Sequence, residues 1–172
     1  MNQYREVSEG TDPSGAPHPP STVEWRPRKE DAVTQQTTPP LDRKRWWPTA
    51  SEIADDVRTN LAAGDEDHAL RMLIDGVNYL PDAHAAGRLG EALVEPESIG
   101  DSRWDALLAG AIRYRLHQSG LPAPRWTRKE PLDTFWWPAA TWASQAYNDM
   151  AHTPAELLRL GIFLDDRAFT SA

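Results

Sequence analysis

The sequence contains no cysteine, which excludes disulfide bonds, a thiol nucleophile and thiolate-based zinc or iron–sulfur sites. It also lacks the basic start and apolar run of a secretory signal. No apolar stretch approaches the roughly 18 residues that a membrane-spanning helix needs. These absences predict a cytoplasmic protein without a membrane segment.

Familiar catalytic patterns are missing as well. There is no Gly-rich phosphate loop and no Gly-x-Ser-x-Gly nucleophile elbow. The five histidines are scattered, and no pair has the i, i+4 spacing of a metal-binding helix. Asp55 and Asp56 are adjacent in a predicted helix and so do not share a face. We therefore expect no enzymatic activity, no metal and no cofactor.

Tryptophan, by contrast, is abundant. The chain of 172 residues has eight tryptophans, against seven phenylalanines and tyrosines together. Indole rings are large and keep an N–H group that needs a partner, so they suit half-buried seams and interfaces. The length suits one domain with a real core and leaves little room for a second.

The net charge of −8 is unevenly distributed. Residues 1–45 hold seven basic and seven acidic side chains, whereas residues 46–172 hold 11 basic and 19 acidic ones. An acidic body is a poor platform for a phosphate backbone, but it suits a protein partner with a basic surface. Charge that only maintains solubility is the alternative explanation.

Residues 1–45 contain seven of the 15 prolines, together with Ser, Thr, Gln and Gly. Such a segment buries too little apolar surface to offset its ordering entropy, which predicts a disordered or extended arm. Two short basic clusters in this arm are candidate contacts to nucleic acid. They consist of Arg26, Arg28 and Lys29, and of Arg43, Lys44 and Arg45. A solvated tail is the alternative interpretation.

Helical signals begin at Thr49 and predict an all-α domain over residues 46–172, a compact bundle of five to six helices. Thr49 and Glu52 form a capping box for a helix over residues 50–63. A second helix is expected over residues 66–80, where apolar side chains follow i, i+3, i+4, i+7 spacing. The short connection predicts an antiparallel hairpin.

Two further helices follow in the sequence. A weaker one is expected over residues 82–95, loosened by Gly87 and Gly90. The strongest helix lies between Gly100 and Gly120. Its predicted buried stripe consists of Trp104, Leu107, Leu108, Ala111, Ile112 and Leu116.

Prolines exclude a helix between Leu121 and Pro138, because the residue before each proline is pushed to extended geometry. We expect an extended strap of aromatic and proline residues, clamped over the helices by its apolar side chains. Two short helices follow, one over residues 139–150 and one that opens with a capping box of Thr153 and Glu156.

The tripeptide Trp-Trp-Pro occurs twice, at residues 46–48 and 136–138, each time before a predicted helix. Apolar residues there can fold back on the first helical turns as hydrophobic staples, which is the favoured interpretation. Because side chains alternate along an extended segment, one Trp of each pair is expected to face outward. Candidate partner contacts are therefore Trp46, Trp47, Trp136 and Trp137, with Asp55, Asp56, Asp165 and Asp166 as complementary charge. Core packing or plain solvation is the alternative for each.

Two stretches carry a resemblance to a known family: GDSRWDALLAGAIRYRLHQSGLPAPRWT, and FWWPAATWASQAYNDMAHTPAELLRLGIFLDD. They resemble small helical bacterial proteins that are usually encoded beside nucleotidyltransferase-like toxins and are regarded as their antitoxins. The resemblance covers roughly residues 49–169. Two features depart from the pattern: the Pro-rich arm, and a last helix that is Arg-rich in the family but here keeps only Arg159.

The resemblance implies a non-catalytic protein-binding module, an antitoxin that neutralises a basic, nucleotidyltransferase-like toxin by covering its site. Two other functions fit the sequence less closely. One is a DNA-binding regulator that uses the basic arm, and the other is a structural or scaffolding assembly protein held by the arm.

Overall fold

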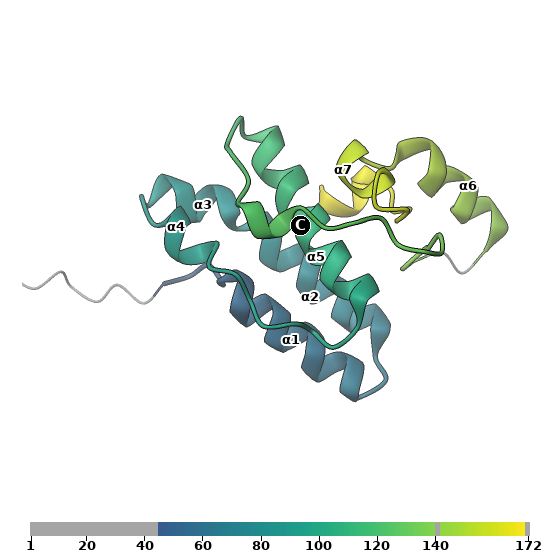
Figure 1. Cartoon of the computed structure of the whole chain (residues 1–172), viewed down its shortest axis with the longest axis horizontal. Coiled ribbons are helices and arrows are strands. Elements are labelled where there is room, and N and C mark those ends of the chain that lie inside the picture. The colour runs from purple at the N-terminus through teal and green to yellow at the C-terminus, as the bar shows by residue number, and fades with distance from the viewer. Residues whose placement is uncertain (1–44, 140–141, 171–172) are drawn as a thin grey trace, which may run out of the picture. The chain divides into compact units, whose positions relative to one another are not determined.

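The computed structural model describes residues 45–139 and 142–170 (Figure 1). Within these ranges the regular elements are seven α-helices and two 3₁₀ helices, so the predicted all-α class is confirmed. The predicted disorder of the arm, and the basic residues Arg26, Arg28, Lys29, Arg43 and Lys44, lie outside the described residues. None of the described helices combines the length and the apolar character that a bilayer crossing requires.

The first two helices form the predicted antiparallel hairpin (Figure 1). Helix α1 (Ala50–Ala62) begins with the predicted capping box: the Thr49 hydroxyl accepts the Glu52 N–H at 3.2 Å, and the Glu52 carboxylate accepts the Thr49 N–H at 2.7 Å. Helix α2 (Glu66–Asn78) begins at Asp65, whose carboxylate accepts the His68 N–H at 2.9 Å. Local capping therefore sets both starting points, as the sequence indicates.

The helix predicted over residues 82–95 is instead two short helices, α3 (Leu80–Ala85) and α4 (Leu89–Ala92). Gly87 separates them because its φ of 71° lies in the left-handed region, which ends a helix. The Gly87 N–H donates to the His84 carbonyl at 2.8 Å, and the Arg88 N–H to the Ala83 carbonyl at 2.9 Å. The prediction of one continuous helix here is wrong.

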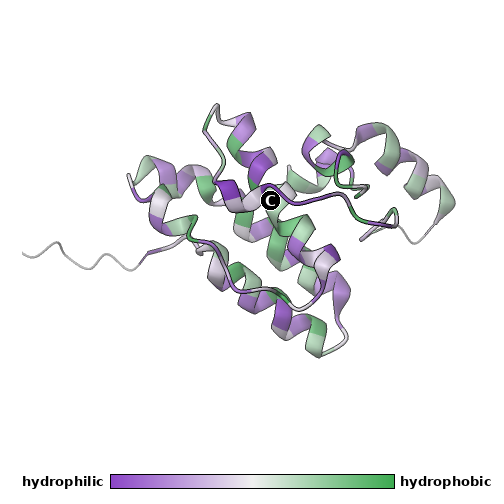
Figure 2. Ribbon diagram, viewed as in Figure 1, coloured by the Kyte–Doolittle hydropathy of each residue, from purple (hydrophilic) through white to green (hydrophobic). Residues whose placement is uncertain are grey.

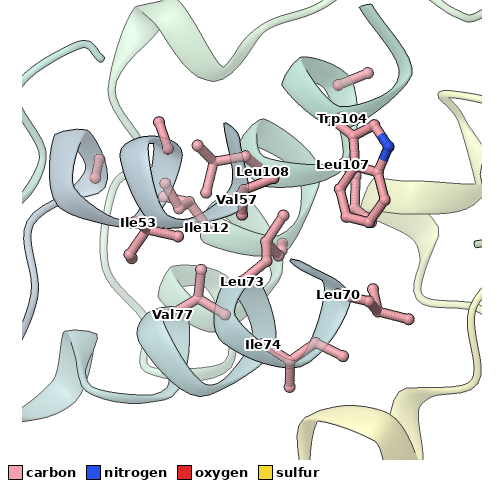
Figure 3. Packing of buried hydrophobic residues seen from close by; sticks show 14 of the residues in the cluster. Ile53, Val57, Leu70, Leu73, Ile74, Val77, Trp104, Leu107, Leu108 and Ile112 are labelled. Carbon is pink, nitrogen blue, oxygen red and sulfur yellow. The ribbon is translucent and has the colours of Figure 1, made fainter. Parts of the chain in front are cut away.

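Helix α5 (Ser102–Gln118) is the centre of the core. Asp101 caps it by accepting the Arg103 N–H at 2.8 Å. The predicted buried stripe of α5 is confirmed, and Ala106, Ala109 and Gly110 are buried too. Figure 3 shows side chains of α1, α2 and α5 meeting in one cluster, among them Ile53, Val57, Leu73, Val77, Leu108 and Ile112.

The predicted strap over residues 121–138 contains no α-helix and only one short 3₁₀ turn, η1 (Arg125–Thr127), with bends at residues 133–134 and 138. Two side-chain hydrogen bonds hold this turn. The Trp126 indole N–H donates to the Leu93 carbonyl at 2.9 Å, and the Thr127 hydroxyl donates to the Pro124 carbonyl at 2.6 Å. The strap is thereby joined to the segment that follows α4.

The C-terminal segment consists of α6 (Ala143–His152), α7 (Ala155–Leu158) and η2 (Asp166–Phe169). The strap pairs with this segment through backbone hydrogen bonds. The Trp136 N–H donates to the Gly161 carbonyl at 2.9 Å, and the Trp136 carbonyl accepts the Phe163 N–H at 2.8 Å. These bonds form an isolated parallel bridge between Trp136 and Ile162.

The capping box predicted at Thr153 and Glu156 is wrong. The Thr153 hydroxyl donates to the Asp149 carbonyl and accepts the Leu164 N–H at 3.2 Å, while the Glu156 carboxylate bonds to the His117 ring at 2.5 Å. Both side chains are used in tertiary contacts, so α7 begins without a side-chain cap.

Gly76→Ala is expected to lower the free energy of unfolding by about 1 kcal/mol, because α1 and α2 touch at this position. A Cβ on Gly76 would lie 2.5 Å from Ile53 Cγ1 and 2.7 Å from Ile53 Cδ1. Overpacking costs about 1–3 kcal/mol, more than the gain of up to about 1 kcal/mol from removing a helical glycine. Urea denaturation followed by far-UV circular dichroism measures the change. The matched control is Gly90→Ala in α4, where a Cβ meets nothing within 4 Å, so that variant should not be destabilised.

Candidate partner-binding surface

The two tryptophans before α1 have opposite environments. Trp46 is 61 % exposed, whereas Trp47 is 5 % exposed and belongs to the core. Their rings meet edge to face at 4.9 Å, and the Arg88 guanidinium lies over the Trp47 ring at 5.9 Å. For this pair, one Trp does face outward as predicted. The partner role assigned to Trp47 is corrected, because its ring is already enclosed by this chain.

The second pair behaves differently, since Trp136 and Trp137 are both half-buried. Trp136 packs edge-on against Trp104 at 5.3 Å, and Trp137 stacks on Phe163 at 4.6 Å. Neither prediction for this pair holds: α6 begins only at Ala143, so these residues are not staples, and neither ring is freely exposed. The backbone bridge to Ile162 keeps this segment extended, and contacts with Trp104 and Phe163 hold the two rings against the chain itself.

The four predicted aspartates lie at two places. Asp55 and Asp56 are exposed on α1, where Asp55 pairs with Arg58 at 2.5 Å. Asp165 caps η2 by accepting the Arg167 N–H at 2.8 Å, and Asp166 is half-buried. Burial opposes ionisation of Asp165, but hydrogen bonds from Arg167 and its charge hold the Asp165 pKa below the usual value.

Arg45 is the one basic candidate of the arm that the structure describes. Its guanidinium forms an ion pair with Glu52, the residue that completes the capping box of α1. This side chain is therefore partly committed to the start of α1. The remaining candidates for nucleic-acid contact lie outside the described residues.

Helix α6 has an inverted pattern of burial. Trp142 at its N-terminal cap is 73 % exposed and Tyr147 is 75 % exposed, with Met150 also on the surface. Helical spacing places Ala143, Tyr147 and Met150 on one face. The only buried residue of the helix is Asp149, which is 3 % exposed. The helix therefore turns its apolar side to solvent and a polar side to the protein.

Polar contacts, not apolar packing, anchor α6. The Gln145 side chain donates to the Ala139 carbonyl at 2.9 Å, and the Asp149 carbonyl accepts the Thr153 hydroxyl. Burial raises the pKa of the Asp149 carboxyl, a hydrogen bond from the Asp165 backbone lowers it, and the nearby Asp165 charge raises it. One Asp149 oxygen, Oδ2, has no hydrogen-bond partner among the described residues.

The position of α6 leaves its apolar face uncovered. It lies at the edge of the unit formed by the described residues and carries residues of both polarities (Figures 1 and 2). No extensive packing joins it to another described helix. A contiguous apolar face of this kind typically marks an interaction site. The spacing in the sequence indicates an apolar face for this helix, but it does not reveal that this face points outward.

One hollow of the described surface, about 350 Å³, is lined in part by Asp105, which already has a structural role. Asp105 within it accepts the Ser98 hydroxyl at 2.6 Å and the Ile99 N–H at 2.8 Å, and thus fixes the loop before α5. No group of three or more His, Asp or Glu residues in the described ranges is arranged to hold a metal ion.

Comparison with known proteins finds no relative of this chain. No protein family matches the chain, and no curated protein or solved structure shows significant similarity to it. The surface of the chain itself is therefore the basis for assigning a function.

Proposed function

We propose that the protein is a non-catalytic protein-binding module whose contact surface is the apolar face of α6. The observation that carries this proposal is the outward orientation of Tyr147 and Met150 on a helix whose buried residue is an aspartate, with exposed Trp142 at its N-terminal cap. Aromatic and methionine side chains are the residues most enriched in protein interfaces. A partner that covers them removes apolar surface from water.

Charge supports a partner with a basic surface. Residues 50–92, which span α1 to α4, contain nine acidic side chains and three arginines. Eight of these nine acidic side chains are exposed, and only Asp75 is half-buried. Such a field attracts a basic protein and raises its rate of association. Trp46, exposed just before α1, supplies an aromatic contact next to this acidic region.

The finer form of the proposal is an antitoxin of the cytoplasm that covers the site of a nucleotidyltransferase-like toxin. The resemblance over roughly residues 49–169 supports it, because that family is regarded as the antitoxin partner of such enzymes. The acidic helices would face the basic substrate cleft of the toxin, and the aromatic side chains would exclude water from the contact.

The test uses the full chain as bait, followed by binding measurements with the purified partner. Tyr147→Ser combined with Met150→Ser should weaken binding about a hundredfold or more, because central aromatic contacts contribute about 2–4 kcal/mol. The melting temperature should hardly change, since both side chains are exposed.

Val94→Ser is the matched control, because Val94 is an exposed apolar residue in a different segment. It should leave the affinity unchanged. If the double variant binds its partner as tightly as the natural chain, the α6 face is not the contact surface. If the purified partner is an acidic protein, the proposed charge complementarity is wrong.

A further inference from the structure

A hollow of about 330 Å³ lies where α2 ends and α3 begins, and its lining combines charge, an aromatic ring and an amide. The lining residues are Asp75, Asn78, Tyr79 and Asp82. Asp82 is exposed, Asp75 is half-buried and Tyr79 is 43 % exposed. Small-ligand sites have volumes of about 300–1,000 Å³, so this hollow suits a single side chain or a group of similar size.

The backbone brings these four residues to one place. Asp75, Asn78 and Tyr79 follow i, i+3, i+4 spacing at the end of α2, which places them on one face. The Tyr79 carbonyl accepts the Asp82 N–H at 3.0 Å, so Asp82 is held one turn later in α3. Leu80 is buried in the core and fixes the start of α3. The arrangement therefore does not depend on a ligand.

The Asn78 side chain indicates that a polar group is missing from this hollow. Its Nδ2 and Oδ1 atoms are both buried, and neither has a hydrogen-bond partner among the described residues. Of the described side chains, it is the one that leaves both a donor and an acceptor unpaired in this way. An unpaired buried polar group costs about 1–3 kcal/mol. A polar ligand can provide the missing hydrogen bonds once this side chain turns towards the hollow.

The charge of the hollow favours a cation. Asp75 and Asp82 contribute two carboxylates, and the last turn of α2 contains no basic residue. Arg71 lies one turn before Asp75 on α2, but the two side chains form no ion pair in the described structure. A cationic group of a ligand can therefore meet both carboxylates in charge-assisted hydrogen bonds.

A guanidinium group fits this lining better than a metal ion. Ca²⁺ takes about six to eight oxygen ligands, more than two carboxylates and one amide supply. No group of three or more His, Asp or Glu residues in the described part of the chain is arranged to hold a metal. A guanidinium has five N–H donors, enough for both carboxylates and the Asn78 oxygen. It also stacks on aromatic rings, and the Tyr79 ring is available at the edge of the hollow.

We propose that this hollow binds an arginine side chain of a protein partner. The carboxylates of Asp75 and Asp82 accept N–H groups of the guanidinium, and the Tyr79 ring stacks on it. A protein is favoured as the source because the hollow belongs to residues 50–92, where nine acidic side chains face three arginines and attract further basic groups. The inference rests on the proposed function for the identity of the basic partner, but it concerns a surface other than the apolar face of α6.

The test is a titration of the full chain with N-acetyl-arginine amide, followed by ¹H–¹⁵N NMR. The side-chain amide signals of Asn78 should shift in a saturable way, with a dissociation constant of about 1 mM for one isolated side chain. N-acetyl-lysine amide should bind several-fold more weakly, because an ammonium group is a point charge without a planar fork. Asp82→Asn should weaken binding of the arginine compound roughly tenfold, the effect of losing one charge-assisted hydrogen bond.

Two further variants complete the titration. Tyr79→Leu keeps an apolar side chain but removes the ring, so it should weaken binding several-fold and does not depend on the folding of the Asp82 variant. Asp56→Asn is the matched control, because Asp56 is exposed on α1, does not line the hollow and loses the same charge. It should leave arginine binding unchanged.

Absence of a saturable shift at Asn78 overturns the proposal, as do equal binding of the lysine compound and an equal loss in Asp56→Asn. Tighter binding of spermidine than of the arginine compound also overturns it, since the hollow would then serve a free polyamine. With the purified partner, Asp82→Asn should again weaken binding about tenfold, and an unchanged affinity would show that the partner does not use this hollow. The contact proposed for α6 is tested separately by the variants of Tyr147 and Met150, so either proposal can fail alone.

Discussion

Trp104→Ala is expected to lower the free energy of unfolding by about 3–5 kcal/mol, the range for removing a large buried aromatic side chain. Trp104 is the largest fully buried side chain of the described core. Its ring lies at the α5 end of the cluster in Figure 3, beside Leu107. A single domain has only about 5–15 kcal/mol of stability in total, so this variant should lose a large share of it.

The loss at Trp104 should extend to the strap. Trp136 packs edge-on against the Trp104 ring, and the Arg103 guanidinium lies over the Trp136 ring at 5.2 Å. Removing Trp104 leaves a cavity under Trp136 and loosens its bridge to Ile162. Trp104→Phe keeps an aromatic ring and should recover part of the stability.

The measurement is urea denaturation followed by far-UV circular dichroism, because seven other tryptophans complicate fluorescence. Trp142→Ala removes the same side chain from an exposed position and should change stability by no more than about 0.5 kcal/mol. Similar losses in the two variants would contradict the burial of Trp104.

Features that depend on local chemistry could be predicted from the sequence. The capping box of Thr49 and Glu52 starts α1 at the expected residue, and the apolar spacing of α5 identifies its buried stripe. Both signals are confined to a single helix, so neighbouring segments hardly alter them. The absence of helix from most of the strap follows in the same way from its prolines.

Features that depend on tertiary contacts could not be predicted. Thr153 and Glu156 have the spacing of a capping box, but Leu164 and His117 take their hydrogen bonds. The second Trp-Trp-Pro precedes helical sequence, but the bridge to Ile162 holds it extended. In each case a partner distant in sequence overrides the local preference.

The candidate contact surface shows the same limit. Residue type alone pointed to the paired tryptophans, yet only Trp46 of the four is freely exposed. The spacing of Tyr147 and Met150 defines a face of α6, but the side of a short amphipathic helix that points inward depends on what lies beneath it. Here Asp149 lies on the inner side, against the usual rule.

Helix α5 links parts of the described structure that are distant in sequence. Trp104 near its start supports the strap, and Gly110 in its middle admits α7. Different surfaces of one buried helix thus position elements that are distant in sequence. Nine of the 17 residues of α5 are buried, which explains how one helix can support several neighbouring elements.

Asp149→Asn is expected to raise the free energy of unfolding at pH 7 by about 1–3 kcal/mol, because the amide keeps the shape of the side chain but removes a charge that burial disfavours. Burial and the Asp165 charge raise the pKa of Asp149 in the folded chain above its ordinary value of 3.8. The folded state therefore binds this proton more tightly than the unfolded state, and the contribution of Asp149 to stability falls as pH rises through the folded pKa.

Because protonation of Asp149 favours the folded state, the difference in free energy of unfolding between the natural chain and the Asn variant should depend on pH. At neutral pH, burial and the Asp165 charge oppose ionisation of the Asp149 carboxyl in the natural chain, so the Asn variant should be more stable. Towards pH 4 the natural chain takes up the proton, and the advantage of the variant should shrink. Other carboxyls with lowered pKa values, such as Asp101 and Asp165, weaken both proteins equally in acid and cancel in the comparison.

Urea denaturation at several pH values between 4 and 7 measures this difference. Asp56→Asn removes an equal charge from an exposed position of α1 and should give a difference that is small throughout the range. A variant at Asp149 that is less stable than the natural chain at pH 7 would show that the ionised carboxylate is needed to anchor α6. The polar inner side would then stabilise the helix through the hydrogen bond from the Asp165 backbone to the carboxylate.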